Sequence, residues 1–393
     1  MAAMTHRERV LATLNHEEPD RVPIDFGCIA STIDSGAYIR LVKQLGMTGE
    51  LDRPDLHDPN EPSKEVTPSP EILEMFGVDT RAVHADAPID SQALVREQID
   101  PYTYRDEWGV IWKRAVHEDG PYMYKESPFE GEGTTVRDIE RYAWPDPEAA
   151  HRASGLKERT RRLHEETDYA IVLSVGHSSV APCQRLRGFA QLMEDLVLQL
   201  VLAEALFEQV TDLIVRSTTA MLKEAGPYID VVSFSDDLGF QDRAYFRAEM
   251  FQKQVKPHLA RCVDAIRSNT DAKVVMHSDG AIYDLIPDLI DIGVEAINPV
   301  QTTAWKMEAS RLKADFGDKL SFWGAVDTQH ALPFGTREDV RQDVRSKIKE
   351  LGPGGGFVIT SCHTIREEVP PENVRALYES VLEFGGYDKL ATL

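Results

Sequence analysis

The residues with the clearest chemical potential lie in the segment Val274-Val-Met-His-Ser-Asp-Gly280. Its β-branched run stops in a polar triplet and a glycine, which is typical of a strand that ends at a site. Residues two apart on a strand point to the same side, so we expect His277 and Asp279 to project together. An imidazole beside a carboxylate can bind a substrate, move a proton or hold a metal ion.

Other short apolar runs also end in polar side chains. Those that could do chemistry are Asp86, His177, Asp236, Asp237, Gln301, Asp327, Gln329, Cys362 and His363. An aspartate that follows a strand is often the N-cap of the next helix, and this alternative is open for Asp86 and Asp327. If the strands are parallel, all of these side chains meet at one edge or mouth, and their convergence indicates a functional site.

The pair Cys362-His363 follows a different apolar run from the one that ends at His277. Imidazole, carboxylate and thiolate are suitable ligands for Zn²⁺, so we predict a divalent metal, with zinc as the expected ion, held by His277, Asp279 and either His363 or Cys362. Two histidines and one carboxylate would also suit Fe(II) or Mn. The alternative is that His277 and Asp279 bond to each other and to a substrate without a metal.

Asp236 and Asp237 are neighbours, and neighbours on a strand point to opposite faces, so at most one should enter the mouth. We predict that Asp236 and His277 act catalytically. The side chains expected to bind substrate are Asp86, His177, Asp237, Asp327 and Gln329. Arg185 and Arg187 could hold an anionic substrate, but a solvated helix face is the alternative.

The elements that would position these residues alternate regularly. Short apolar runs that are each followed by a helical pattern occupy residues 21–27, 79–87, 170–175, 230–234, 273–276, 294–298, 320–323 and 356–360. Such alternation favours parallel strands covered on both faces, and eight units favour a closed (β/α)8 TIM barrel. A doubly wound sheet would need a glycine-rich turn after its first strand, and Phe26-Gly-Cys-Ile-Ala-Ser31 is not one.

We expect a single domain over residues 1–393, with two additions to the barrel. Residues 6–16 form an N-terminal amphipathic helix, and residues at about 91–135 form a small β insertion. Within the insertion we predict two antiparallel strands, 107–113 and 122–125, with a turn at Asp119-Gly120. The insertion could be a plain flap or a lid over a substrate.

Composition excludes several classes of partner. Acidic residues outnumber basic ones 66 to 43, which gives a formal charge of −23 and argues against nucleic acids and anionic membranes. No apolar run approaches the ~18 residues that a membrane helix needs. The four cysteines lack framework spacing, so we expect thiols in a reducing cytoplasm.

Several segments together resemble the uroporphyrinogen decarboxylase family. The matching segments are 7–12, 19–24, 186–189, 236–239, 277–280, 298–301, 324–329 and 369–374. The resemblance covers nearly the whole chain and implies a (β/α)8 barrel, as the strand pattern does. One branch of the family decarboxylates a tetrapyrrole without a cofactor and looks for arginines just after the first strand, whereas Gly27 to Asp34 contains none.

The other branch transfers methyl groups with zinc and a corrinoid. Its motif is His-x-Cys-Gly after strand five with a cysteine after strand eight, and here Asp279 stands where that cysteine would be. Counting back from Pro370 places His363 at the second ligand position, with Cys362 one residue before it. The resemblance therefore implies a harder metal site. The corrinoid signature Asp-x-His-x-x-Gly is absent from the sequence, so a cobamide would have to arrive on a separate corrinoid protein.

Three functions follow as hypotheses. The first is a metal-dependent methyltransferase that acts on a methylated small molecule, with a corrinoid protein, a thiol or tetrahydrofolate as partner. The second is a metal-free carboxy-lyase acting on a small organic acid, with Asp236 or His277 as the proton donor. The third is a non-catalytic carrier that docks a partner protein. The assembly is left open, with a homodimer as one option.

Overall fold

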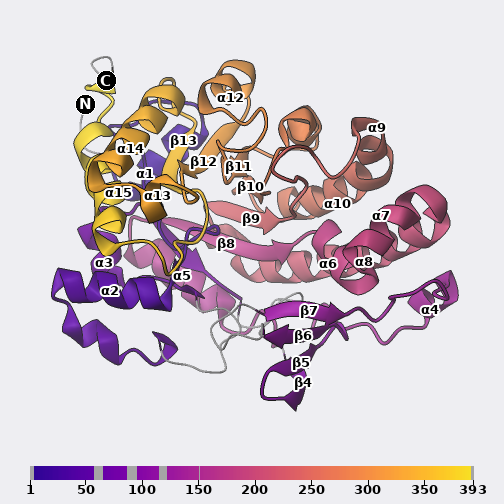
Figure 1. The fold of residues 1–393 in the computed structure, drawn as a ribbon. Coiled ribbons are helices and arrows are strands. Elements are labelled where there is room, and N and C mark those ends of the chain that lie inside the picture. Colours follow the sequence, from indigo (N-terminus) through magenta and orange to yellow (C-terminus); the bar gives the residue numbers. More distant parts are fainter. Residues whose placement is uncertain (1–3, 57–64, 86–94, 115–121, 150, 391–393) are drawn as a thin grey trace.

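The computed structural model describes residues 4–56, 65–85, 95–114, 122–149 and 151–390. Its centre is a parallel sheet of seven strands in the order β13-β12-β11-β10-β9-β8-β3. The strands are β3 (Thr80–Val83), β8 (Ala170–His177), β9 (Val231–Ser235), β10 (Lys273–His277), β11 (Ala296–Asn298), β12 (Ser321–Val326) and β13 (Phe357–Ser361). Figure 1 shows the strands surrounded by helices.

The segment around Ile24 closes this sheet into a barrel. Ile24 bridges Ile359 of β13 in parallel, and the Ile359 amide donates to the Pro23 carbonyl at 3.0 Å. On the other side, the Asp79 amide donates to the Ile24 carbonyl at 2.8 Å, just before β3. We call this segment around Ile24 the first stave of the barrel. Together with the seven strands it makes the eight strands of a TIM barrel, which confirms the predicted fold class.

The barrel interior is filled by alternate residues of the strands, because successive side chains point to opposite faces. The strand residues that form this buried cluster are Ala170, Val172, Val231, Val275, Ala296, Trp323 and Val358. Val10 and Leu14 of helix α1 (His6–Leu14) belong to the same cluster. The predicted N-terminal helix therefore caps the barrel core, and a Thr5–Glu8 capping box fixes its start.

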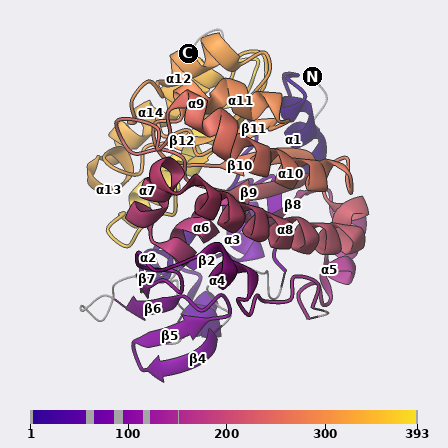
Figure 2. The ribbon, with the colours of Figure 1, turned by 90° about the vertical axis from the view of Figure 1, so that its right-hand side faces the viewer.

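Helices cover the outside of the barrel in both views of the ribbon (Figures 1 and 2). Besides α1 they are α2 (Ser35–Leu45), α3 (Pro70–Met75), α4 (Val136–Glu140), α5 (Leu156–Glu166), α6 (Val180–Arg187), α7 (Phe189–Leu198), α8 (Leu200–Ala225), α9 (Ala248–Met250), α10 (Lys256–Arg267), α11 (Ile286–Asp291), α12 (Ala309–Phe316), α13 (Ala331–Phe334), α14 (Arg337–Leu351) and α15 (Pro371–Phe384). Five short segments have 3-10 or π geometry: η1 (Thr48–Asp52), η2 (Pro54–Leu56), η3 (Gly226–Tyr228), η4 (Phe251–Val255) and η5 (Tyr283–Leu285).

The β insertion is a separate antiparallel sheet that lies beside the barrel, opposite α12 in both ribbon views (Figures 1 and 2). Its strands are β4 (Val95–Asp100), β5 (Thr103–Asp106), β6 (Ile111–Arg114) and β7 (Tyr122–Glu126). The two predicted strands correspond to β6 and β7, and β4 and β5 were not predicted. The predicted turn at Asp119-Gly120 lies outside the described residues. One further pair of short strands, β1 (Ile33–Asp34) and β2 (Glu65–Val66), is antiparallel.

Two helical stretches of the chain are interrupted in the structure. Residues 136–166 form α4 and α5 with irregular chain between them, where Pro145 and Pro147 lie. The second stretch begins at Ala248 as α9, passes through the π segment η4 and continues as α10. Proline lacks the amide proton that a helix interior needs, and Pro257 sits in the first turn of α10, where it is tolerated.

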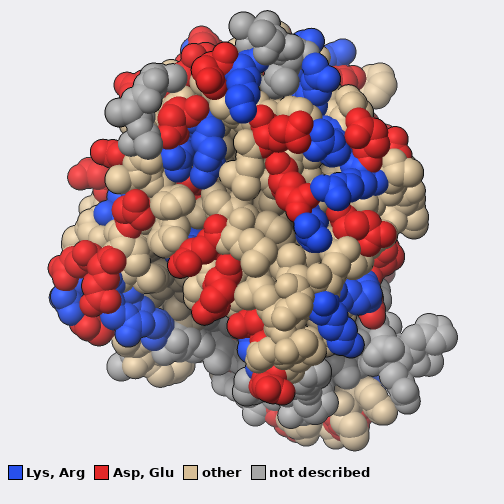
Figure 3. All heavy atoms as spheres, turned by 90° about the vertical axis from the view of Figure 1, so that its left-hand side faces the viewer, with Lys and Arg blue, Asp and Glu red and all other residues tan. Residues whose placement is uncertain are grey.

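Acidic residues outnumber basic ones, but they do not form one continuous acidic surface on the left-hand side of the molecule in Figure 1. Figure 3 shows acidic and basic side chains lying side by side there, and ion pairs such as Arg341–Glu383, at 2.7 Å, link α14 to α15. No helix among the described residues is long and apolar enough to cross a membrane.

Asp79 holds the closure of the barrel together. Its carboxylate is fully buried and accepts hydrogen bonds from Arg9, at 2.6 Å, and from Arg21 and the Ile24 amide, both at 2.7 Å. The His6 ring nitrogen lies 2.7 Å from the same carboxylate. Burial works to raise the pKa of Asp79, but the bonds from His6, Arg21 and Arg9 outweigh it and hold that pKa below its ordinary value.

We predict that Asp79→Ala lowers the free energy of unfolding by about 3–5 kcal/mol, because it leaves buried cations without their partner. Chemical denaturation with a fluorescence readout measures the change. The control is Asp212→Ala, since Asp212 is half exposed and its ion pair with Arg216 is long, at 3.7 Å. Equal destabilisation by the two variants would contradict this role of Asp79.

Candidate functional site

His277, Asp279 and His363 come together at the carboxyl end of the barrel. One potential ligand atom from each lies within 4.8 Å of the others. The Asp279 carboxylate is 3.9 Å from His277 Nε2 and 3.7 Å from His363 Nε2. The loops after β10 and β13 therefore share one mouth, as the sequence predicted.

His277 points inward because it stands two residues after Val275, which lies in the barrel core. Its Nδ1 is 2.6 Å from the Asn298 side-chain oxygen, and the Asn298 amide nitrogen donates to the Trp323 carbonyl at 3.2 Å. That second bond orients the amide so that its oxygen faces the imidazole. Neutral His277 thus carries its proton on Nδ1 and directs a bare Nε2 at Asp279.

Two backbone turns pack closely to position Asp279. The Asp279 amide donates to the Asp237 carboxylate at 2.9 Å, and the Ala281 amide donates to the Phe240 carbonyl at 2.7 Å. Gly280 has a φ of +87°, and a Cβ there would lie 2.2 Å from the Gly239 carbonyl oxygen. Only glycine fits this approach, which explains why a glycine follows Asp279.

Burial shifts the pKa values of the other two groups, Asp279 and His363. It raises the pKa of Asp279 above its ordinary value, against the favourable effect of the two histidines. Burial also lowers the pKa of His363, which favours the neutral ring. The Thr364 amide donates to His363 Nδ1 at 2.7 Å. Neutral His363 therefore keeps its proton on Nε2, the nitrogen that faces Asp279.

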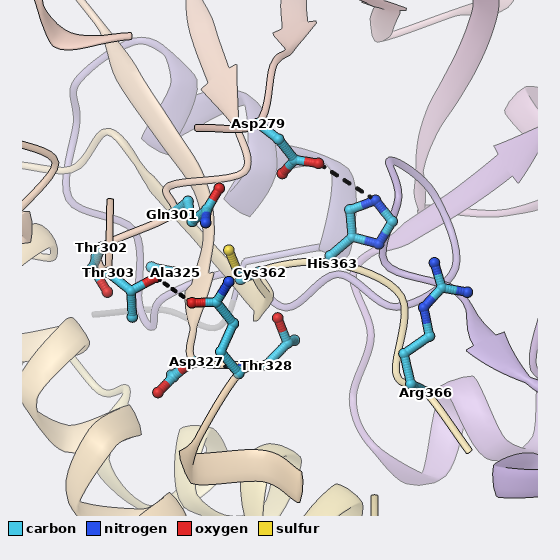
Figure 4. A pocket seen from close by; sticks show the side chains of 11 residues that line it. Asp279, Gln301, Thr302, Thr303, Ala325, Asp327, Thr328, Cys362, His363 and Arg366 are labelled. Atoms are coloured by element: carbon cyan, nitrogen blue, oxygen red, sulfur yellow. Dashed lines mark hydrogen bonds and ion pairs between the residues drawn. The ribbon is translucent and has the colours of Figure 1, made fainter. Parts of the chain in front are cut away.

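A pocket of about 320 Å³ opens beside this cluster. It is lined by Asp279, Gln301, Thr302, Thr303, Ala325, Asp327, Thr328, Gln329, Cys362, His363 and Arg366. Figure 4 shows the Asp279 carboxylate facing the His363 ring at one end and amide and hydroxyl side chains at the other. Ala325 has a φ of +81°, an uncommon conformation for a residue with a side chain, and such strain is frequent at functional sites. The volume and lining suit a small polar molecule.

The structure gives Asp236 a position away from this pocket. Its carboxylate is fully buried and accepts from the Ser178 hydroxyl and from the amides of Val180 and Ala181, at the start of α6. Burial raises the pKa of Asp236 to about 6, against those hydrogen bonds. As expected for neighbours, only one member of the acidic pair faces the mouth, and it is Asp237, which lies 4.0 Å from His277 Nε2.

The remaining predicted residues divide between the pocket and its surroundings. Asp327 lines the pocket, but its carboxylate accepts the amides of Gln329, His330 and Ala331, which is the turn role considered from the sequence. Gln329 accepts from the Thr303 hydroxyl at 2.8 Å. Cys362 lines the pocket with its thiol 3.8 Å from the Val300 carbonyl, and burial raises its pKa well above the ordinary range.

His177 lies at the end of β8, where Arg185 reaches its Nε2 at 2.9 Å. Arg187 is not on a solvated face, because it is buried in an ion pair with Asp195 at 2.5 Å. Gln301, also expected from the sequence, accepts the Gly280 amide at 2.8 Å in the pocket wall. Asp86 lies outside the described residues.

Several residues of the site were missed from the sequence, and three of them bear on its chemistry. Asn298 orients His277, Arg366 lines the pocket, and Tyr245 lies near the acidic groups. Burial, followed by Asp237 and Asp279, raises the pKa of Tyr245 to about 12, so its phenol stays protonated. The register could have indicated Asn298, since it pairs directly with His277 across β10 and β11.

Comparison with known proteins identifies relatives. A model described as uroporphyrinogen decarboxylase (URO-D) matches residues 122–384. The uroporphyrinogen decarboxylase of Actinobacillus succinogenes is 24% identical over 183 residues, which cover 46% of this chain and 48% of that protein. The same enzyme of Mannheimia succiniciproducens is 22% identical over 202 residues, 50% of this chain and 53% of that protein. The chain thus spans about half the length of these curated relatives.

A solved structure extends the similarity to nearly the whole fold. A methyltransferase from Methanosarcina mazei matches with a TM-score of 0.67 and 20% identity, over 97% of this chain and 99% of that chain. At that identity the match shows a shared fold.

We predict that the Asn298 amide sets the tautomer of His277. In metal-free protein labelled with ¹⁵N-histidine, NMR should show Nδ1 protonated and Nε2 bare for His277. Asn298→Leu removes the acceptor and should shift the ring toward protonation at Nε2. His277→Ala assigns the signals, and a His277 protonated at Nε2 in the unaltered protein would contradict the prediction.

Proposed function

The chain belongs to the uroporphyrinogen decarboxylase family, and we propose that it is a metal-dependent methyltransferase of that family. The metal would be a divalent ion, with zinc expected, held by His277, Asp279 and His363. Its substrate would be a methylated small molecule. A corrinoid protein, a thiol or tetrahydrofolate would be the partner in methyl transfer.

The observation that carries this proposal is the convergence of two imidazoles and one carboxylate within 4.8 Å. Zinc bonds of about 2.0–2.2 Å place neighbouring ligand atoms roughly 3.3 Å apart in a tetrahedral site. The separations of Asp279 from the two histidines, 3.9 and 3.7 Å, are a few tenths of an ångström longer. Because the three ligand atoms are bounded only by 4.8 Å, the two imidazoles would also have to move toward each other to complete the site.

The candidate ligands are not equally ready to bind a metal ion. His277 needs no change, because Asn298 holds its proton on Nδ1 and leaves Nε2 free. Asp279 must be ionised, which a cation favours. To bind the ion through Nε2, His363 would have to carry its proton on Nδ1, or its ring would have to flip. Either change breaks the hydrogen bond that the Thr364 amide donates to Nδ1. Cys362 is the weaker candidate because its buried thiol holds its proton.

When bound, the ion would supply Lewis acidity toward the methyl donor or acceptor. The protein groups would position the substrate. Asp237 has a half-exposed carboxylate 4.0 Å from His277 and can orient a polar group above the cluster. Gln301 and Gln329 present amides to the same pocket. The TM-score with the Methanosarcina mazei methyltransferase supports this branch at the level of the fold.

We expect purified protein to retain about one divalent ion per chain after dialysis, measured by mass spectrometry of the elements. His277→Ala and Asp279→Ala should lose it, and Asn298→Ala should weaken binding about 10- to 100-fold, the usual effect of removing a group that orients a ligand. His151→Ala is the control, because His151 is exposed and remote from the cluster in sequence. Equal metal content in all variants, or full activity without metal, would contradict the proposal.

A second candidate, a metal-free carboxy-lyase acting on a small organic acid, is favoured by one specific contact. Because the Thr364 amide occupies His363 Nδ1, the Nε2–H of His363 faces the pocket and can donate a proton to a carbon. The curated relatives support it by name, since both are uroporphyrinogen decarboxylases. Asp236 is fully buried, and His277 holds its proton on Nδ1 against Asn298, so His363 is the better placed proton donor.

The carboxy-lyase predicts that chelator-treated protein releases CO₂ from small acids. His363→Ala should slow that release by about 10²- to 10⁴-fold, the usual contribution of a general acid. Labelled CO₂ is measured with His151→Ala as the control. Release that stops when the metal is removed would reject this candidate and favour the methyltransferase.

A further inference from the structure

Arg366 stands apart among the side chains that line the site pocket. Of the eleven lining residues it is the one with a permanent positive charge. It lies three residues after His363 in the loop that follows β13. Figure 4 shows its guanidinium on one side of the His363 ring and the Asp279 carboxylate on the other. A molecule that contacts both would span the imidazole.

The partners of Arg366 hold it without using all its donors. Its Nη1 is 3.4 Å from the Asp34 carboxylate and 3.2 Å from the Glu65 carboxylate. Charge-assisted bonds to arginine are usually about 2.7–2.9 Å long, so both pairs are loose. Both pairs use Nη1, and the described residues make no other hydrogen bond or ion pair with Arg366. Its Nε and Nη2 are therefore available to a ligand.

The two carboxylates have other partners of their own. The Thr32 hydroxyl donates to Glu65 at 2.7 Å, and the Glu367 amide donates to Asp34 at 3.1 Å. They would keep their positions if Arg366 turned toward the pocket. This arrangement holds an arginine at the pocket edge and leaves part of its binding capacity unused.

We propose that Arg366 binds the carboxylate of the substrate, and that the substrate is a small monoanion whose reacting end lies at the cluster of His277, Asp279 and His363. The proposal rests on the proposed function for the reacting end, and it adds the chemical class of the molecule. Arginine presents paired N–H donors that match a carboxylate in geometry and charge.

The charged side chains around Arg366 favour a ligand with a single negative charge. Arg366 is the one arginine that lines the pocket, and the Asp34 and Glu65 carboxylates already lie beside it, so a phosphate dianion would meet more repulsion there than a single carboxylate. The far wall presents the neutral side chains of Gln301, Thr303 and Thr328. Asp327 also lines it, but its carboxylate accepts three backbone amides. The neutral groups suit hydroxyl, ether or amide oxygens. The volume of about 320 Å³ admits a molecule of modest size.

Binding of matched acids and amides tests the proposal without requiring turnover. The probes are methoxyacetate, 3-methoxypropanoate and 4-methoxybutanoate, each beside its primary amide, with inorganic phosphate as the dianion. Titration calorimetry should show at least one acid binding about 10-fold tighter than its amide. Arg366→Gln should remove that preference, and Arg366→Lys should retain part of it because the charge remains.

Arg40→Gln is the matched control, since Arg40 contacts Glu367 beside Arg366 and does not line the pocket. It should keep the preference for the acid. The titrations are repeated with His277→Ala, where the preference should survive, so failure of the metal proposal would not imitate failure of this one. The proposal is overturned if no acid binds better than its amide, if Arg366→Gln keeps the preference, or if phosphate binds more tightly than every acid.

Discussion

The site depends on a barrel that closes, and closure depends on one buried carboxylate. Asp79 lies where the first stave meets β3, and it neutralises Arg9 from the N-terminal helix and Arg21 from the chain before that stave. A buried charge is stable only when its partners are in place. The Asp79 carboxylate therefore favours the one arrangement in which the N-terminal helix, the chain before the first stave and the start of β3 meet. Once the first stave is fixed between β3 and β13, the loops after β10 and β13 must open onto one mouth.

The strand period then decides which side chains enter that mouth. Val275 packs in the core, so His277, two residues later, faces the same interior one layer higher. Its neighbour across the sheet, Asn298, faces inward for the same reason and becomes the partner that selects the tautomer. The chemistry of His277 is thus a consequence of register, and the imidazole needs no additional element to orient it.

These rules also explain how far the sequence could lead. Alternating apolar runs and helices predicted the eight staves, and the same pattern brought residues 277 and 363 to one end. Periodicity stops where a strand stops, however. β10 ends at His277, and Asp279 is placed by a turn that packs against Gly239. Asp236 follows β9 but serves the start of α6, and no local pattern distinguishes that use from catalysis. Arg366 lies in a loop beyond β13, and its position depends on Asp34 and Glu65, which are remote in sequence.

The two candidate functions differ by the position of a proton. His277 is prepared to accept a cation at Nε2, because Asn298 holds the hydrogen on the opposite nitrogen. His363 is prepared in the opposite sense, because the Thr364 amide occupies Nδ1 and leaves the hydrogen on Nε2. With Asp279 between them, the cluster can share either a metal ion or a proton. A metal must displace the hydrogen of His363, whereas a carbon substrate could receive it. The balance is therefore set at His363, and a substrate anchored by Arg366 would lie directly against that ring.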